Sequence, residues 1–192
     1  MAAVARASLR LKYILLPYLY TLFYHHATSG HTVVRPLWHE FPTDVTTYDI
    51  DTQFMWGSSF IFAPIIEQGT SERQMYLPEG DLWYSGENLL RDKVNGWVTV
   101  VSDLDDGDQV PLFIRAGTIY PSHHSSSGNY ETTTEAKKSP MDLRVTLRDD
   151  KTASGDLYLD DGESIDAEIN NYSYMGSSTN YRDYGCNVYL RF

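Results

Sequence analysis

The sequence predicts a mainly β protein with one N-terminal helix, followed by an antiparallel β-sandwich and the start of a second β-domain. Apolar and aromatic residues recur at helical spacing over residues 4–30. After Gly30 the pattern changes to short runs of Val, Ile, Phe, Tyr and Trp that alternate with Gly, Pro, Asp and Ser. Seven such runs with frequent turn signals are typical of an antiparallel sandwich or barrel, and they cover residues 31–36, 53–56, 59–66, 73–77, 81–84, 97–101 and 110–119.

The predicted helix over 4–30 has one apolar face and ends at Gly30, a residue that favours helix C-termini. A helix face of this kind needs an apolar partner, so we expect it to be covered by other parts of the protein. Its members are spaced by four, three, four and three residues, and they are Leu9, Tyr13, Leu16, Tyr20 and Phe23.

Two prolines interrupt predicted elements. Pro17 lies inside the helix and removes one backbone hydrogen bond, so the helix is expected to bend there or to divide in two. Pro64 lies inside the run 59–66, where it places the strand at a sheet edge or ends its hydrogen-bonded ladder.

Residues 122–139 are polar and of low complexity, which is typical of a linker or a long surface loop. His123 and His124 lie in this stretch and could resemble metal ligands. No carboxylate or thiol stands at ligand spacing from them, so a solvated loop is the favoured interpretation.

The second β segment begins after this stretch. Alternation of apolar and polar residues predicts a strand whose buried face is made of Leu143, Val145 and Leu147. Residues 187–192 again have the pattern of a strand, and the chain ends inside it. We therefore expect further strands beyond Phe192.

The composition excludes several classes of function. The formal net charge of −11 argues against binding to nucleic acid or to an anionic membrane, because both need positive surface. No apolar stretch approaches the ~20 residues of a membrane span, and no signal peptide with a cleavage site is visible. The single cysteine, Cys186, excludes an intrachain disulfide and is expected to be an ordinary buried thiol.

Four blocks of sequence resemble glycoside hydrolase family 31, in the family's order. Residues 9–42, LRLKYILLPYLYTLFYHHATSGHTVVRPLWHEFP, resemble its RY-x-LLPYLYTLF helix and the V-V-R-P-L-x-H-E-F run after it, with Lys12 in place of Arg. Residues 51–89 resemble its Q-F-x-x-G segment and W-Y motif, although Ser85 follows where an aromatic is usual. The other two blocks are VPLFIRAGTIYP at 110–121 and SGDLYLDDGESID at 154–166.

The resemblance implies a C-terminal fragment of a retaining α-glucosidase of the maltase, isomaltase and lysosomal α-glucosidase type. It implies that 1–30 are the last helix of the (β/α)8 catalytic barrel and that 31–121 are a proximal β-sandwich. Residues 122–139 would be a linker or long loop, and 140–192 the start of a distal β-domain. The oligosaccharide substrate would bind through the barrel. The parent protein would be lumenal, in lysosome or endoplasmic reticulum, or secreted or cell-surface, which a glycosylation sequon at Asn171 supports slightly.

The catalytic carboxylates that such an enzyme needs are not found in the sequence. Retaining hydrolysis uses two carboxyl groups about 5 Å apart, and the family's nucleophile lies in a W-x-D-M-N-E-like motif. The nearest imitation, WHEF at 38–41, lacks the Asp and the Asn. We therefore expect no catalytic, cofactor-binding or metal-binding residue in this chain, and no activity from the chain alone.

Two acidic clusters are interpreted as structural turns. One surrounds Gly107 but lacks the full calcium-loop pattern, and the other follows the strand that ends at Leu159. Their members are Asp103, Asp105, Asp106 and Asp108 in the first, and Asp160, Asp161 and Glu163 in the second.

The alternative function is a non-catalytic carbohydrate-binding β-sandwich module. Such a module should present exposed, coplanar aromatic rings as stacking platforms, and the candidates are Trp83, Tyr84 and Trp97. A further alternative is a processing glucosidase II of the endoplasmic reticulum, because the barrel loops that select the substrate are absent from this sequence.

Overall fold

The structure is a computed structural model that describes residues 2–80, 82–85, 91–92, 95–101, 110–124, 132–162, 173–182 and 185–191. The chain divides into two compact units, each of which is described by itself. The first unit consists of Met1–Leu11 and Thr32–Ala116, and the second consists of Lys12–His31 and Gly117–Phe192.

The N-terminal helix is divided in two, as Pro17 predicts. The helix α1 spans Ala2–Ile14 and α2 spans Leu16–Ser29. Pro17 lies in the first turn of α2, where a backbone N–H would have no acceptor within the helix, so its absence costs no hydrogen bond. Gly30 ends α2 in the left-handed conformation with φ 71°, and its N–H donates to the carbonyl of His26 at 2.9 Å.

The buried face of α2 is not the face that the apolar spacing indicates. Pro17, Tyr18 and Thr21 are buried, whereas Tyr20 is 40% exposed and Phe23 is 52% exposed. Within the described residues these two members of the apolar stripe remain exposed, and the expectation that other parts of the protein cover them stays a prediction. Tyr18 and Thr21 lie on another face of α2, and Thr21 contacts β11 of the second unit's sheet.

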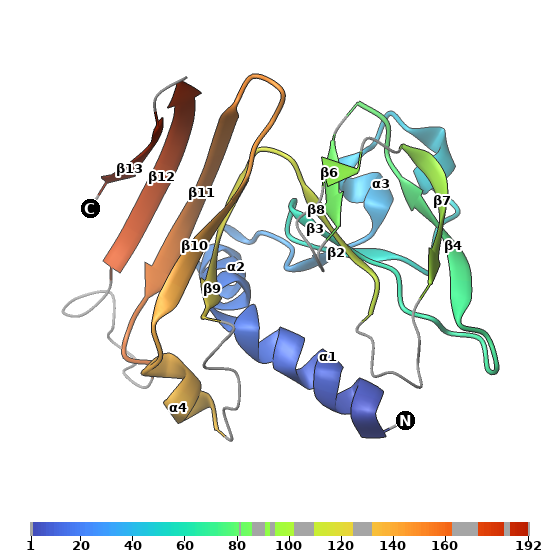
Figure 1. The fold of residues 1–192 in the computed structure, drawn as a ribbon, viewed down its shortest axis with the longest axis horizontal. Helices are drawn as coiled ribbons and strands as arrows, with labels where there is room; N and C mark the ends of the chain where they lie inside the picture. Colours follow the sequence, from blue (N-terminus) through green and yellow to red (C-terminus); the bar gives the residue numbers. More distant parts are fainter. Residues whose placement is uncertain are drawn as a thin grey trace. The chain divides into compact units, whose positions relative to one another are not determined.

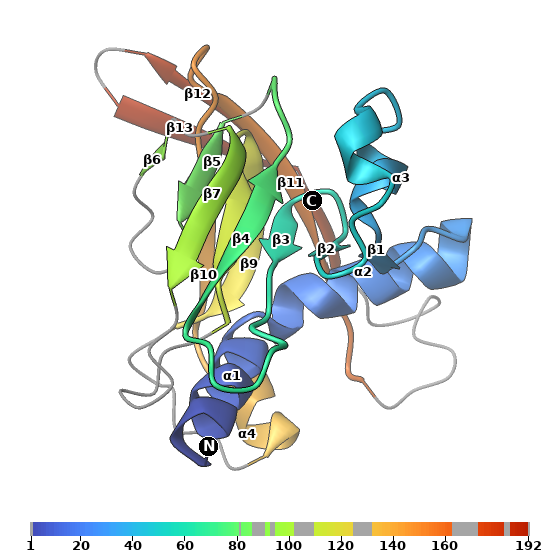
Figure 2. The ribbon, with the colours of Figure 1, turned by 90° about the vertical axis from the view of Figure 1, so that its right-hand side faces the viewer.

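The first unit contains two sheets. The larger sheet has its strands in the order β1-β2-β3-β8-β5-β6, every neighbouring pair of which is antiparallel. The smaller sheet pairs β4 with β7, also antiparallel, and Figure 2 shows these two strands side by side. The strands are β1 Val34–Arg35, β2 Phe54–Trp56, β3 Phe60–Phe62, β4 Glu72–Leu77, β5 Trp83–Ser85, β6 Arg91–Asp92, β7 Gly96–Val101 and β8 Leu112–Arg115.

One apolar core joins the two sheets, which is the arrangement of a β-sandwich. The larger sheet contributes Met55, Ile61 and Trp83, and the smaller one contributes Met75 and Leu77; all five are fully buried. Two short helices close one side of this core, α3 at Leu37–Glu40 and the 3₁₀ helix η1 at Val45–Thr47.

Pro64 ends a ladder rather than marking a sheet edge. The strand β3 lies between β2 and β8 in the larger sheet and stops at Phe62. Ala63 still donates its backbone N–H to the carbonyl of Pro111 at 3.0 Å. Of the two readings of Pro64 in the sequence, the one in which it ends the ladder is confirmed.

The second unit contains one five-stranded sheet, packed against α2. The strand order is β10-β9-β11-β12-β13, and all pairs are antiparallel except β9 with β11, which are parallel through Thr118 and Ser154. Figure 1 shows α2 beside β9 and β11, the two strands that it contacts. The strands are β9 Thr118–His123, β10 Met141–Thr146, β11 Thr152–Leu159, β12 Ser173–Arg182 and β13 Gly185–Arg191.

Thr21 joins α2 to β11 at a buried point. Its hydroxyl donates to the carbonyl of Pro17 at 2.9 Å and accepts from the backbone N–H of Tyr158 at 3.1 Å. The ring of Tyr158 stacks on that of Tyr24, with centroids 3.9 Å apart and planes inclined by 10°. Polar and aromatic contacts together therefore fix the end of β11 on the helix.

Two sequence interpretations need correction in this region. The run 110–119 is two strands, β8 and β9, because the chain turns at Ala116 and Gly117, the latter with φ 82°. The stretch 122–139 differs from a linker at both ends, since Ser122 and His123 are buried in β9. At its other end, Thr133–Lys137 form the short helix α4.

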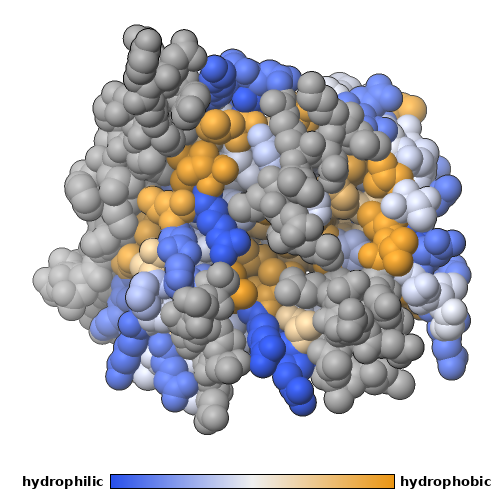
Figure 3. Space-filling model, in the orientation of Figure 1, coloured by the Kyte–Doolittle hydropathy of each residue, from blue (hydrophilic) through white to orange (hydrophobic). Residues whose placement is uncertain are grey.

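The strand β10 does not bury the face that its alternation indicates. Thr146 is almost completely buried, whereas Leu143 is exposed. Figure 3 shows apolar side chains at the surface over β10. The face of β10 that carries Thr146 is the buried one at this point. The Thr146 hydroxyl can be buried because it donates to the carbonyl of Thr118 at 3.2 Å.

Candidate functional site

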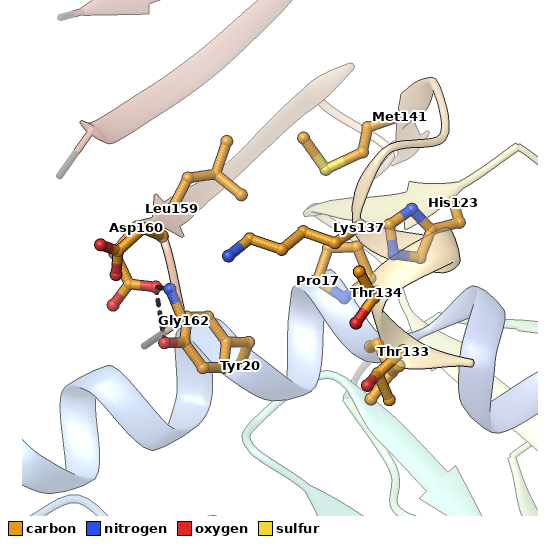
Figure 4. Close-up of a pocket in the computed structure, with 12 residues that line it drawn as sticks. Pro17, Tyr20, His123, Thr133, Thr134, Lys137, Met141, Leu159, Asp160 and Gly162 are labelled. Atoms are coloured by element: carbon orange, nitrogen blue, oxygen red, sulfur yellow. Dashed lines mark hydrogen bonds between the residues drawn. The ribbon is translucent and has the colours of Figure 1, made fainter. Parts of the chain in front are cut away.

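A cavity of about 310 Å³ lies within the second unit. It is lined by α2, by the short helix α4, by the first residue of β10 and by the turn that follows β11 (Figure 4). The lining mixes apolar and polar side chains, and its main members are Leu16, Tyr20, Thr134, Lys137, Met141 and Leu159.

Asp160 holds one wall of the cavity in place. Its carboxylate accepts hydrogen bonds from the Tyr20 hydroxyl at 2.7 Å and from the backbone N–H of Gly162 at 2.7 Å, both at Oδ1. Its Oδ2 accepts from the Tyr158 hydroxyl at 2.9 Å. The carboxylate is therefore used to fix the turn and the tyrosine ring, which agrees with the interpretation of the Asp-Asp-Gly segment as structural.

Two titratable groups in the lining are shifted by their surroundings. Burial, followed by the hydrogen bond to Asp160, raises the pKa of Tyr20 far above its usual value, so the phenol keeps its proton. Burial lowers the pKa of His123, which favours the neutral imidazole. The Nδ1 atom of this histidine lies 2.9 Å from the Ser139 hydroxyl.

The helix α4 brings Lys137 to the cavity, and a sequence signal for this helix was available. Thr132 accepts from the backbone N–H of Glu135 at 3.2 Å, and Thr-x-x-Glu is the capping-box pattern of a helix N-terminus. The low complexity of the flanking residues obscured that signal. Figure 4 shows Lys137 extending from α4 toward the turn at Asp160 and Gly162.

Glu40 of the WHEF segment is engaged in a structural ion-pair cluster in the first unit. Its carboxylate pairs with the guanidinium of Arg35 through Oε1 and lies 3.8 Å from Nη1 of Arg115 through Oε2. The Arg115 guanidinium also lies over the ring of Phe41, 4.8 Å from its centroid. The carboxylate between the two guanidinium groups therefore buttresses α3 against β8.

The aromatic residues that a carbohydrate-binding module would need do not form a platform. Trp83 is completely buried and donates its indole N–H to the carbonyl of Pro78 at 3.1 Å. Trp97 is 54% exposed, but its ring packs at 51° against Tyr76. Tyr84 is half-buried on a strand of the other sheet. These three rings are therefore not exposed together in one plane, as a sugar-stacking platform would need.

Of the two neighbouring histidines, His123 departs from the predicted solvated loop, whereas His124 is exposed and follows β9. His123 is buried in β9, and His124 pairs through Nδ1 with the carboxylate of Asp142 at 2.8 Å. Within the described residues, no group of three or more His, Cys, Asp or Glu side chains could hold a metal ion. Of the other candidates, the Asp103–Asp108 cluster, Glu163 and Asn171 lie outside the described residues, as does the side chain of Cys186.

Comparison with known proteins identifies the family. Residues 30–120 match the model described as "Glycosyl hydrolase family 31 C-terminal domain". The chain is 40% identical over 164 residues to human probable maltase-glucoamylase 2 and 37% identical over 179 residues to rat lysosomal alpha-glucosidase. These alignments cover 85% and 83% of this chain, but only 6% and 18% of the relatives.

Solved structures agree with this assignment. A GH31 dextranase of Flavobacterium johnsoniae, complexed with glucose, superposes with a TM-score of 0.78 at 30% identity. The superposition covers 93% of this chain and 21% of the dextranase chain. None of the described helices has the length and apolar character that crossing a membrane requires. By its matching domain and by these relatives, the chain belongs to glycoside hydrolase family 31.

Proposed function

We propose that this chain is the C-terminal supporting region of a retaining α-glucosidase that removes terminal α-linked glucose from oligosaccharides. The observation that carries the proposal is the identity of 37–40% to proteins named as maltase-glucoamylase and lysosomal alpha-glucosidase, over more than four fifths of the chain. The chain spans less than a fifth of those relatives. Catalysis would then depend on residues outside the part that matches, and this chain would contribute none.

The surface of the N-terminal helices supports a role in packing against a larger body. Leu9 of α1 is 55% exposed and Phe23 of α2 is 52% exposed, although both belong to the apolar stripe. Large apolar side chains exposed on helices are typical of surfaces that another element covers. We infer that the covering element is the catalytic barrel and that residues 1–30 are its last helix.

The remaining divisions follow the same proposal. Residues 31–121 would form the proximal β-sandwich, 122–139 the connection, and 140–192 the start of the distal domain. The cluster of Glu40 with Arg35 and Arg115 would keep the start of the sandwich rigid where it leaves the helix. The selection of substrate would remain a property of the barrel.

The experiment is a graft. The matching segment of rat lysosomal alpha-glucosidase is replaced by this chain, and hydrolysis of maltose is compared with that of the same enzyme lacking the segment. We expect the graft to restore a folded, active enzyme and the isolated chain to hydrolyse neither maltose nor an aryl α-glucoside. The proposal fails if the graft folds without activity, or if the isolated chain shows turnover that an acidic-residue substitution abolishes.

A matched pair of variants tests the proposed barrel contact within the graft. Phe23→Asp places a charge on the exposed apolar face and should prevent assembly of active enzyme, because a buried unpaired charge is strongly unfavourable. Ser29→Asp, at the exposed last residue of the same helix, is the control and should leave activity intact. Equal activity of the two variants would contradict the assignment of the helix to the barrel.

The alternative of a carbohydrate-binding module that stacks sugar on Trp83, Tyr84 and Trp97 receives no support from the arrangement of these rings. Trp83 belongs to the apolar core of the first unit. Removing it should unfold the sandwich rather than weaken a sugar contact.

A further inference from the structure

We infer that the cavity of the second unit is a sugar-binding site that accepts a neutral ligand of one or two rings. Its volume of about 310 Å³ lies at the lower end of the range of about 300–1,000 Å³ of small-molecule sites. The choice of a sugar among neutral ligands rests on the proposed function. The existence of the site rests on the geometry of the cavity.

The charges in the lining favour a neutral ligand. Lys137 contributes one positive charge, and Asp160 and Asp161 contribute two negative ones. These charges sum to −1, so a simple anion would be repelled overall, and the ammonium group would repel a simple cation placed beside it. A molecule with hydroxyl groups can both donate and accept, so it is the chemistry that this mixture accommodates.

Lys137 is the polar group best placed to contact such a ligand. Its Nζ lies beside Gly162, only 2.9 Å from where a Cβ of that residue would be. Among the described residues it forms no ion pair. The Asp160 carboxylate nearby is already occupied by three donors. The ammonium group therefore has hydrogen-bond capacity to offer.

The other walls match the two kinds of surface on a sugar ring. Thr133 and Thr134 are exposed on the first turn of α4 and bring hydroxyl groups to the cavity. Across the cavity from these threonines lies the ring of Tyr20, and Met141 lies above Lys137 in this view (Figure 4). Leu16 adds a further apolar side chain to the lining. A sugar has C–H groups on its face and hydroxyl groups at its rim, so the face would lie on Tyr20 and the rim would meet α4.

The test uses the 192-residue chain with ¹³C-labelled methionine methyl groups, titrated with glucose, maltose or inorganic phosphate. Met141 lines the cavity, whereas Met55 and Met75 are buried in the first unit and serve as internal controls. We expect glucose or maltose to shift the Met141 signal in a saturable manner and to leave the two controls unchanged. A shift with phosphate alone, equal shifts of all three signals, or no shift of Met141 would overturn the inference.

A matched pair of lysine variants locates the contact. Lys137→Met should weaken binding about tenfold or more, because a hydrogen bond from a charged donor is lost. Lys138→Met, on the neighbouring residue outside the cavity, should bind as the unaltered chain does. Thr134→Val removes a hydroxyl from an exposed position and repeats the test without altering the lysine. Equal affinity of all variants would refute the site.

The two proposals fail in different experiments. The graft measures catalysis and assembly, and the titration measures binding to the chain alone. A Met141 shift with an inactive graft would keep the sugar site and remove the glucosidase role. An active graft without a shift would do the reverse.

Discussion

Gly155→Ala should destabilise the second unit more than any other single methyl addition that the structure describes. A Cβ at Gly155 would lie 2.7 Å from the carbonyl carbon of Ile119, and closer still to its oxygen. Ordinary carbon–carbon contacts are about 3.5–4.0 Å, so β9 and β11 would have to separate by roughly 1 Å. They are joined nearby by the bond from Ser154 N to Gly117 O, 3.0 Å long, which such a movement would break.

The expected cost is about 3 kcal/mol, at the upper end for overpacking, because backbone rather than a flexible side chain must move. At equilibrium this lowers hydrogen-exchange protection of β9 and β11 roughly 150-fold. Amide exchange is the suitable assay, since the four tryptophans all belong to the first unit and their fluorescence does not monitor the second. Ser154→Ala, at an exposed neighbour, is the control. Equal protection in the two variants would refute the close approach of the strands.

Three further changes have defined outcomes. Thr21→Val removes the acceptor of the backbone N–H of Tyr158 and should lower the free energy of unfolding by about 1–3 kcal/mol. The assay is urea unfolding monitored by hydrogen exchange in β11. As a control, Thr28→Val removes a similar hydroxyl bond from the exposed end of α2 and should change the free energy of unfolding by under about 0.5 kcal/mol. Glu40→Gln removes the charge that pairs with Arg35 and should cost about 2 kcal/mol, read from tryptophan fluorescence in urea. An unchanged midpoint would show that the cluster is not stabilising. The imidazole of His123 should titrate in NMR spectra below about 6.5, because burial lowers its pKa. Its folded-state pKa lies below the unfolded value, so its contribution is complete above about pH 6.5 and stability falls as pH decreases through that value; a midpoint at or above 6.5 would contradict the burial.

The sequence was sufficient to predict the helices and strands whose apolar periodicity agrees with the positions of the prolines and glycines that end them. The runs at 53–56, 73–77 and 97–101 match β2, β4 and β7 to within one residue. The division of the N-terminal helix followed from Pro17, because a missing N–H and a fixed φ act locally. The turn at Ala116 and Gly117 was missed inside an otherwise continuous apolar run, although a glycine with φ 82° is what separates the two strands.

The candidate site could not be assembled from the sequence. Lys137 belongs to a stretch whose composition is typical of a linker, while Tyr20 and Asp160 are 140 residues apart along the chain. Local patterns cannot indicate that a tyrosine on a helix will donate to a carboxylate after a distant strand. The structural role of the Asp-Asp-Gly turn was inferred correctly for Asp160, since an Asp that accepts from the N–H two residues later forms a turn.

The helix α2 shows why an apolar pattern identifies a need for partners without identifying the partner. Its buried side includes Tyr18 and the polar Thr21. Thr21 can be buried because its hydroxyl donates to one backbone carbonyl and accepts from one backbone N–H. Its apolar stripe, with Phe23 at its end, remains exposed in this chain. One face of α2 is therefore packed on the sheet through Thr21, and another face carries exposed apolar side chains. Such a helix has two surfaces to bury. The second surface is accounted for if the helix is part of a larger body, which is the arrangement that the proposed barrel supplies and that Phe23→Asp in the graft tests directly.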